Sequence, residues 1–505
     1  MGTQRAVLAG ATAMALTATL ATASSAPASD NAASAVVLPA LASAVAAGAA
    51  PAVLTWDRDV ASAAEVRAHL AAEGVRATVL DGLSIAFACA GGPRELTSLA
   101  SAPGAVSVWG DERLEAAPVT TSAAAGGVAP MGTDGVGLDG SGVGLAVVDT
   151  GLDSTHDAFT GRTLSNVRVL VSHREILGYG DPPPCQDFYT AELEDSELSS
   201  GHGTHLAGVA AGNDAAAPGL APAADLVGVG VSDSVVVDTD LRDANRLSMF
   251  SALAGLNYAL ITGLDSANPI KVVLAGWVGK GLHNPFHPVS LAVRDLHDFG
   301  MTVVLPVGNG GAADSDCSTV QTCRISPFAV GSFAVGVAST TADGAALSAF
   351  SSRGDPEPRT AEGFPVSYEP LLAAPGESVI GPRRLGTANV MTPPTSFHAG
   401  GGSPTADQTD LDHVAMTGTS VAAAQVAGAV VLMQQAARDA TGCFLPAATV
   451  RRLLTDTARP LPGAARHQAG TGVLDVDAAV AAALLEEPVR RNDPWMCPRT
   501  HGGTS

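Results

Sequence analysis

The sequence predicts an α/β protein with a largely parallel β-sheet covered by helices on both faces, preceded by a small α+β unit. Across residues 141–485, short apolar runs alternate with stretches of helical periodicity, which is typical of parallel strands joined by helices. Across residues 52–115, the order is strand, helix, two strands, helix, strand, as in a ferredoxin-like unit. The chain has 505 residues, 46% of them hydrophobic, which suffices for a large domain beside a smaller one.

The N-terminal region predicts export from the cell. Residues 1–28 carry one cation, Arg5, followed by small and apolar residues and two small-x-small sites, which is typical of a secretory signal peptide. Residues 29–51 are also Ala-rich, and since two prolines and a glycine interrupt them, we interpret them as a linker rather than a membrane span. We therefore expect a secreted, extracellular protein with no membrane span in its mature form.

The small unit is expected to span residues 52–115, with its elements read from changes of periodicity. Residues 116–140 are rich in Ala, Thr, Ser and Gly, so we expect an exposed connector, where proteolysis concentrates. The predicted strands are 52–56, 75–80, 83–90 and 105–112, and the predicted helices are 61–74 and 93–104.

The large unit is expected to span residues 141–485 and to be followed by a polar, Pro-containing tail at 486–505. Its longest helical stretch contains mostly small residues, which favours close packing inside a core. The predicted strands are 144–149, 224–231, 270–276, 301–307 and 332–339, and the predicted helices are 205–213, 249–263, 288–300 and 420–440.

The charge balance disfavours two classes of partner. Lys and Arg number 27 against 49 Asp and Glu, which gives a net charge of -22. Such a protein repels nucleic-acid phosphates and anionic membrane surfaces. We therefore expect no nucleic-acid partner.

Export makes the six cysteines potential disulfide partners. Spacing suggests that Cys317 pairs with Cys323 across a short loop, and that Cys443 pairs with Cys497 to join the tail to the body. The other two cysteines have no evident mate. No CxxC motif occurs, so a zinc or redox site has little support.

Four polar residues stand where predicted strands end or helices begin, which is where reactive groups gather in parallel α/β sheets. Asp149 ends GLAVVD, His202 lies in GHGTHLAGVAAG, Asn309 ends TVVLPVGN and Ser420 lies in GTSVAAAQVAG. Asp, His and Ser are the parts of a nucleophilic triad. The amide of Asn309 would stabilise the oxyanion, together with the N–H of Ser420 at the helix terminus.

Other chemistries fit these residues less well. The DTG tripeptide at Asp149 is also typical of aspartic proteases, but that mechanism needs a second carboxylate, and no second DTG or DSG occurs. His202 and His205 lie three apart without an HEXXH motif, so we interpret His205 as a helix-embedded side chain rather than a metal ligand. An α/β-hydrolase would show GxSxG and the order Ser, Asp, His.

The four blocks resemble those of the subtilisin-like serine proteases, the subtilases. VVDTGLDSTH, GHGTHLAGVAAGN, VLPVGNGG and GTSVAAAQVAGA are similar to the family's Asp, His, oxyanion Asn and Ser blocks, within a resemblance that covers roughly residues 140–484. It implies a three-layer αβα fold and a monomeric serine endopeptidase that cleaves polypeptides with no cofactor in the catalytic step. Subtilases often bind structural calcium. Residues 192–197 are acidic, but such a run is usually only solvated, so its ligands stay unassigned.

The resemblance extends to the small unit. Subtilases commonly carry a ferredoxin-like propeptide that assists folding, inhibits the enzyme and is cut away, and residues 52–115 look like one of the inhibitor-I9 type. We therefore expect a zymogen that processes itself in the connector after Glu115.

Two of the predicted substrate-binding segments depart from the family pattern. Gly276, Trp277 and Val278 stand where the family usually has a Ser-Leu-Gly strand that pairs with substrate. Main-chain pairing can persist, but we expect Trp277 and Val278 to reshape the pockets. An alternative of another class is a non-catalytic binding or scaffolding protein on this fold, which these departures favour and the complete set of four catalytic positions disfavours.

The second departure precedes the oxyanion Asn. Pro306 and Val307 partly replace the small residues that the family has beside Gly308, where the backbone flanks the specificity pocket. We therefore expect a narrower pocket that accepts small or medium apolar residues.

Overall fold

The structure is a computed structural model, and the residues that it describes lie in the unit Ala35–Ser505. The predicted signal peptide, 1–28, and most of the predicted tail, 486–505, lie outside these residues. The described residues are 35–117, 119–122, 128–132, 137–170, 189–215, 217–232, 246–265, 269–311, 313–384, 412–487 and 495–497.

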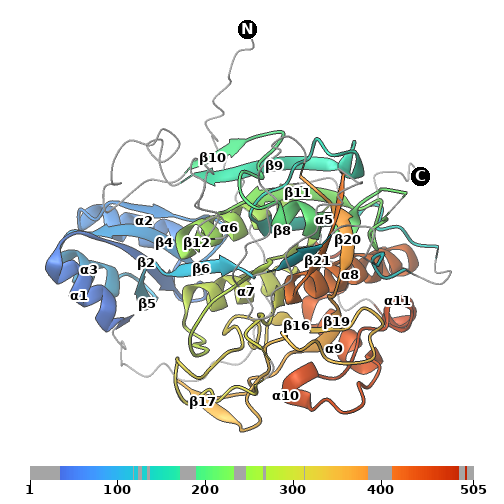
Figure 1. The fold of residues 1–505 in the computed structure, drawn as a ribbon. Helices are drawn as coiled ribbons and strands as arrows, with labels where there is room; N and C mark the ends of the chain where they lie inside the picture. Colours follow the sequence, from blue (N-terminus) through green and yellow to red (C-terminus); the bar gives the residue numbers. More distant parts are fainter. Residues whose placement is uncertain are drawn as a thin grey trace. The chain divides into compact units, whose positions relative to one another are not determined.

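The N-terminal unit is a five-stranded sheet in the order β1-β5-β2-β4-β3 (Figure 1). Its strands β5, β2, β4 and β3 pair antiparallel in the order of a ferredoxin-like unit, as predicted, and β1 adds a parallel strand at the β5 edge. The elements are β1 (Val36–Val37), α1 (Pro39–Ala47), β2 (Ala50–Trp56), α2 (Ala63–Ala72), β3 (Ala77–Val79), β4 (Ile85–Ala90), α3 (Pro93–Ala100) and β5 (Ala105–Gly110).

The predicted linker at residues 29–51 is wrong for its described part, because β1, α1 and the start of β2 lie there. Pro39 is the first residue of α1, where a proline lacks only an N–H that has no intrahelical acceptor anyway. Gly48 follows the last residue of α1. The proline and the glycine therefore mark the two ends of a helix rather than interrupting a linker.

Strand residues of the N-terminal unit alternate between two cores, as the two-residue period of a strand requires. On β2, Leu54 packs with α1, α2 and α3, whereas Val53 faces the other way. On β4, Phe87 also faces away from these helices and stacks on Phe250 at 4.6 Å between ring centroids. The second face of this sheet is therefore covered by the large unit.

The large unit is built on an eight-stranded sheet in the order β10-β9-β11-β8-β13-β15-β16-β19. All neighbours pair in parallel except β10 and β9. The strands are β8 (Gly144–Asp149), β9 (Thr163–Leu170), β10 (Tyr189–Glu192), β11 (Asp225–Gly230), β13 (Ile270–Leu274), β15 (Thr302–Pro306), β16 (Ala334–Thr340) and β19 (Leu372–Pro375).

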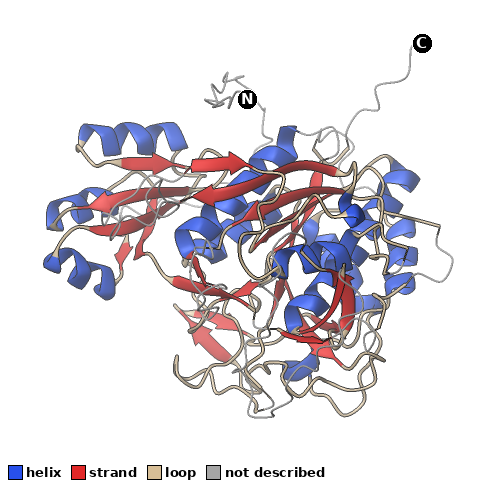
Figure 2. Ribbon diagram, turned by 45° about the horizontal axis from the view of Figure 1, so that its top comes forward, coloured by secondary structure: helices blue, strands red, loops and turns tan. Residues whose placement is uncertain are grey.

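Helices cover both faces of this sheet, which confirms the three-layer prediction (Figure 2). On β8, Leu145 and Val147 pack with α5, α8, α9 and α11, whereas Ala146 and Val148 pack with α6 and α7. The helices are α5 (His202–Ala211), α6 (Met249–Asp265), α7 (Pro288–Asp298), α8 (Thr419–Thr441), α9 (Ala447–Thr457), α10 (Arg466–Ala469) and α11 (Val476–Leu485), with a 3-10 turn at Asp157–Phe159.

Three small sheets complete the described fold, two of them with one strand from the segment that follows the N-terminal unit. Their orders are β12-β6-β14 and β20-β21-β7, and β17 pairs with β18 as a hairpin. The strands are β6 (Arg113–Ala116), β7 (Thr120–Ser122), β12 (Arg246–Ser248), β14 (Trp277–Val278), β17 (Arg359–Ala361), β18 (Phe364–Val366), β20 (Val379–Pro382) and β21 (His413–Thr417).

Both disulfides suggested by spacing are confirmed: Cys317 pairs with Cys323, and Cys443 pairs with Cys497. Cys89 is also disulfide-bonded. In the part of the chain that the structure describes, α8 is the one helix long and apolar enough to cross a membrane, but its apolar window is completely buried. It packs with α5, α9 and α11 in the core on one face of the eight-stranded sheet.

The N-terminal unit docks on α6 and α7 through polar contacts as well as apolar ones. Asp295 of α7 is almost fully buried and accepts the backbone N–H of Ser84 at 3.0 Å and the guanidinium of Arg58 at 2.9 Å. Asn257 of α6 accepts the backbone N–H of Gly82 at 3.0 Å. Two of the partners of this buried carboxylate therefore come from the N-terminal unit, which ties that unit to α7.

Candidate active site

Asp149, His202 and Ser420 meet at one edge of the eight-stranded sheet. Asp149 is the last residue of β8, His202 the first residue of α5 and Ser420 the second residue of α8. His202 Nδ1 lies 2.6 Å from Asp149 Oδ1, and His202 Nε2 lies 2.9 Å from Ser420 Oγ. All three side chains are buried. The imidazole is therefore held between a carboxylate and a hydroxyl at hydrogen-bonding distance on both sides.

Two glycines permit this close approach. A Cβ on Gly203, in the first turn of α5, would lie 2.2 Å from the carbonyl oxygen of Gly151. A Cβ on Gly276, after β13, would lie 2.3 Å from Asp149 Oδ2 and 3.1 Å from His202 Cε1. Gly276, one of the predicted substrate-binding residues, thus lies directly against the Asp-His pair, which explains why its position has no side chain.

The charge state of His202 is set by two buried carboxylates. Burial by itself would lower the pKa of His202, but the charge and hydrogen bond of Asp149, with a further contribution from the charge of Glu197, raise the pKa above its ordinary value. His202 is therefore well suited to accept a proton and to hold it as an imidazolium.

Glu197 was missed by the sequence analysis as a part of this site. It is fully buried and accepts the hydroxyl proton of Thr150 at 2.5 Å. The same hydroxyl oxygen accepts the backbone N–H of Gly203 at 2.8 Å. Glu197 thereby links the residue after Asp149 to the first turn of the helix that carries His202. In the sequence it lies inside an acidic run that is typical of a solvated surface.

His205 is embedded in α5, as predicted. Its Nε2 lies 3.1 Å from the carbonyl oxygen of Val379 and 3.2 Å from that of Val414. Burial, followed by the charge of His202, lowers the pKa of His205 to about 3, so it stays neutral at physiological pH.

The structural calcium stays a prediction. Within the described ranges, no group of three or more His, Cys, Asp or Glu side chains is arranged to hold a metal ion. In the acidic run at 192–197, Asp195 pairs with Arg384 at 3.1 Å, and Glu197 is engaged by Thr150.

Asn309 lies beside Ser420, as an oxyanion donor must. Its Oδ1 accepts the backbone N–H of Thr419 at 2.9 Å and the hydroxyl of Thr419 at 2.8 Å. Its Nδ2 and Ser420 Oγ both lie 3.4 Å from the point where a Cβ on Gly418 would stand. Thr419 therefore orients the amide so that its nitrogen faces the space next to the nucleophile.

The predicted substrate strand is already paired with a segment of the chain itself. β6 lies between β12 and β14 and runs antiparallel to both, with Ala116 opposite Trp277 and Glu115 opposite Val278. The backbone N–H of Ala117 donates to the carbonyl oxygen of Gly276 at 2.9 Å. In Figure 1, β6 extends from the N-terminal unit into the large unit. Main-chain pairing at this edge therefore persists despite the unusual sequence.

The structure places the other predicted substrate-binding residues differently from what their bulk suggested. The indole of Trp277 is fully buried and donates to the carbonyl oxygen of Val148 at 3.0 Å, so it fills the core that contains α6 and α7 rather than a pocket. The side chain of Val307 is buried in the same core, and Pro306 is buried at the end of β15. Gly308 follows with φ 104°, a conformation that favours glycine.

Comparison with known proteins agrees with this geometry. A relative named extracellular protease, from Xanthomonas campestris pv. campestris, is 28% identical over 421 residues, which cover 77% of this chain and 61% of the relative. Subtilisin BL from Lederbergia lenta is 32% identical over 179 residues, which cover 35% of this chain and 51% of the relative. The matches thus span about half to three fifths of these relatives' lengths.

The fold also matches a solved structure. Fervidolysin from Fervidobacterium pennivorans, a keratinolytic enzyme related to subtilisin, aligns with a TM-score of 0.55 at 18% identity and covers 86% of this chain and 61% of its own. This likeness concerns the fold alone. The model of the subtilase family, peptidase S8, matches residues 140–474, which is more than half of the chain. The protein therefore belongs to the subtilase family.

Proposed function

We propose that the protein is a secreted serine endopeptidase that uses Asp149, His202 and Ser420 as its catalytic triad. The observation that carries the proposal is the position of His202, with one ring nitrogen 2.6 Å from Asp149 and the other 2.9 Å from Ser420. In this arrangement Ser420 Oγ attacks the peptide carbonyl carbon while its proton passes to His202 Nε2. Asp149 stays ionised and stabilises the imidazolium that forms.

The carbonyl oxygen becomes an oxyanion in this step and needs fixed donors. Ser420 is the second residue of α8, and the first N–H groups of a helix have no intrahelical acceptor. We assign the oxyanion to the N–H of Ser420 and the amide Nδ2 of Asn309. His202 then gives its proton to the leaving amine, which releases the first product and leaves an acyl group on Ser420. Water, activated by the same histidine, hydrolyses this ester.

The N-terminal unit is proposed to be a propeptide that inhibits the enzyme and assists its folding. An extended peptide binds a strand edge through main-chain hydrogen bonds, which is how β6 pairs with β14. Ala117 donates to Gly276, which lies against Asp149 and His202. The sequence of residues 113–117 thus takes the place of a substrate strand, and we propose that self-cleavage follows it closely.

Secretion is proposed from the predicted signal peptide and from the name of the Xanthomonas relative. N-terminal sequencing of protein purified from the culture medium tests this and the processing site together. We expect a mature N-terminus within the few residues after Ala117. A product that begins at residue 29 or earlier would contradict self-processing.

A fluorophosphonate probe distinguishes the endopeptidase from a non-catalytic protein on the same fold, because it reacts only with an activated serine. We expect the processed protein to be labelled at Ser420, and the Ser420→Ala variant to stay unlabelled with its N-terminal unit attached. A folded, processed protein that resists the probe would favour the scaffolding alternative.

A further inference from the structure

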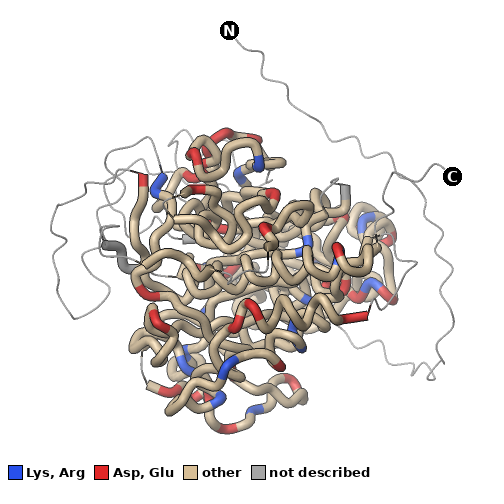
Figure 3. The backbone as a smooth tube through the Cα atoms, turned by 90° about the vertical axis from the view of Figure 1, so that its right-hand side faces the viewer, with Lys and Arg blue, Asp and Glu red and all other residues tan. Residues whose placement is uncertain are grey.

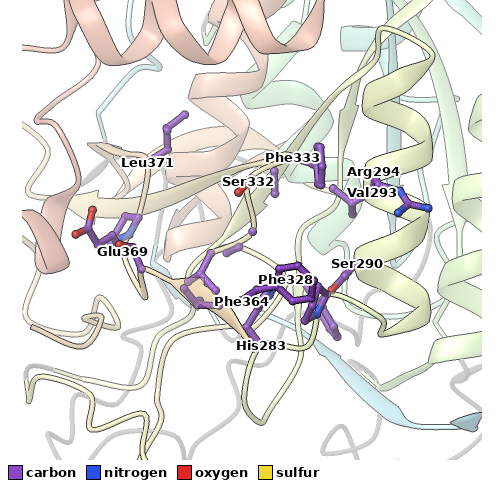
Figure 4. Close-up of a pocket in the computed structure, with 18 of the residues that line it drawn as sticks. His283, Ser290, Val293, Arg294, Phe328, Ser332, Phe333, Phe364, Glu369 and Leu371 are labelled. Carbon is purple, nitrogen blue, oxygen red and sulfur yellow. The ribbon is translucent and has the colours of Figure 1, made fainter. Parts of the chain in front are cut away.

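A cavity lies outside the triad and is formed by segments from distant parts of the chain (Figure 4). It has a volume of about 760 Å³. Its walls come from the loop before α7, from α7, from residues 328–334, from β18 with the following loop, and from α9 and α10. None of its lining residues is a proposed catalytic residue.

The cavity is unusually aromatic for this chain. Four phenylalanines line it, although the chain has only 12: Phe286, Phe328, Phe333 and Phe364. Phe364 is 54% exposed and Phe333 is 36% exposed. Phe286 and Phe364 meet edge to face at 6.1 Å between ring centroids. Exposed rings that face a concave space are typical of a site for an apolar ligand.

The same cavity is rich in cations. Arg294, Arg451 and Arg466 line it together with one carboxylate, Glu369. The whole chain, in contrast, has a net charge of -22, and acidic positions are spread widely along it (Figure 3). Glu369 accepts Arg466 Nε at 2.7 Å and is thereby occupied.

Arg451 is the cation that most needs a partner. Its Nη1 is buried and has no hydrogen-bond partner among the residues that the structure describes. Burial lowers the pKa of Arg451 to about 10, so the guanidinium is still protonated at neutral pH. Because burying a charge without a partner is costly, an anion at the part of the guanidinium that lines the cavity would be favoured.

We propose that this cavity binds a carboxylate with an apolar body. The carboxylate pairs with the guanidinium of Arg451 where it lines the cavity, and the apolar body packs on the phenylalanine rings. A singly charged carboxylate fits better than a phosphate, because Glu369 repels additional negative charge. Two sources supply this chemistry: the C-terminus of a peptide, such as a cleavage product with an aromatic end, and a free organic acid.

The cavity also borders the back of the substrate-pairing strand. A Cβ on Gly279, next to β14, would lie 2.3 Å from the ring of Phe328, and the rings of Phe328 and Trp277 lie 6.1 Å apart. Ser326 Oγ accepts the backbone N–H of Gly279 at 3.3 Å. A ligand that contacts Phe328 is therefore separated by one layer of side chains from β14, the strand that pairs with β6. We expect the ligand to change KM rather than kcat, a consequence that rests on the proposed protease function.

Direct binding tests the site without any need for activity. The Ser420→Ala protein is titrated calorimetrically with decanoate, with the peptide acetyl-Ala-Ala-Phe, and with the amide of the same peptide. We expect at least one free acid to bind and the amide to bind at least tenfold more weakly than the free peptide. Decanoate alone would identify a free acid as the source, and the peptide alone would identify a C-terminus. Equal affinity of acid and amide, or no binding of any probe at millimolar concentration, would overturn the proposal.

Two adjacent arginines of α9 provide a matched control. Arg451→Gln removes the guanidinium that lines the cavity, whereas Arg452→Gln removes an exposed one that pairs with Glu486 and Asp456. We expect a loss of affinity of at least tenfold for Arg451→Gln and less than twofold for Arg452→Gln. Equal losses would contradict the assignment.

A second variant covers the case in which Arg451→Gln fails to fold. Phe364→Ala alters a ring that is more than half exposed, so it leaves the core intact. We expect it to weaken binding of the free acid at least threefold, and an unchanged affinity would argue against the cavity. With active protein, the ligand should change KM for a peptide substrate, and Arg451→Gln should abolish this effect. If the ligand binds without any change of KM, the proposed effect on substrate pairing is refuted, but the binding site is not.

Discussion

Replacing Gly276 with alanine tests how closely the substrate strand is fitted to the triad. The new Cβ would stand 2.3 Å from Asp149 Oδ2 and 2.4 Å from Leu206 Cδ1. A carbon and an oxygen that are not bonded normally stay roughly 3.3 Å apart, so about 1 Å of movement is required. The methyl of Leu206 can rotate away, but Asp149 is held by His202 at 2.6 Å and by the N–H of Thr150 at 2.7 Å.

The cost of this movement falls on catalysis, because Asp149 orients the histidine. A misplacement of about 1 Å in a catalytic site costs roughly 100-fold in rate, which corresponds to about 2.7 kcal/mol. We expect kcat/KM for a chromogenic peptide to fall by about this factor in Gly276→Ala. Fluorophosphonate labelling should slow in proportion, since it depends on the same activated serine.

A matched glycine variant separates this effect from a general cost of substituting glycine. Gly132→Ala places a Cβ where no atom lies within 4 Å, and Gly132 is not among the glycines with positive φ. It should retain full activity. If Gly276→Ala keeps kcat/KM within threefold of the parent while folding normally, the close fit between this strand and the triad is not needed for catalysis.

Three further predictions concern the site and β6. Glu197→Gln removes a negative charge that raises the pKa of His202, so the imidazole should lose its proton at lower pH. The acidic limb of the pH profile of kcat/KM should therefore move to lower pH. An unmoved limb would mean that Glu197 has a purely structural role. Asn309→Ala should cost on the order of 3 kcal/mol, the loss known for the oxyanion amide of subtilisin, seen mainly in kcat; an unchanged kcat would remove Asn309 from the mechanism. Leu114→Ala removes a buried side chain from β6, at a usual cost of roughly 2 to 5 kcal/mol. When the separate N-terminal unit is mixed with the processed enzyme, this variant should inhibit at least 30-fold more weakly than the parent unit. Unchanged inhibition would mean that β6 does not hold the unit in place.

The sequence was sufficient to predict that Asp149, His202 and Ser420 meet, because they stand at ends of regular elements. A strand with the pattern of GLAVVD and a helix that begins at GHGTH leave little freedom in where Asp149 and His202 lie. The alternation of strands and helices predicted the layers for the same reason, since each period specifies which face of an element is buried.

Other features depend on which side chains the fold buries and on which face of a strand a residue lies. The local sequence determines neither. Glu197 stands in an acidic run, and only the fold encloses it beneath Thr150. Trp277 lies in a strand of two residues, too short for its period to show which side chain faces the core. The helix Pro39–Ala47 is so rich in alanine that no apolar stripe distinguishes it from a linker.

Gly276 connects the departure from the family pattern with the segment that follows β6. Its missing side chain makes room for the carboxylate of Asp149, and its carbonyl oxygen accepts the N–H of Ala117. A substrate that pairs with the same edge has to displace this bond, so the N-terminal unit and the substrate compete for one acceptor. The preference for small or medium apolar side chains stays a prediction. Because Val307 and Trp277 face the core, this preference would have to come from how closely the backbone at Gly276 and Gly308 approaches the bound chain, rather than from the bulk of the pocket walls.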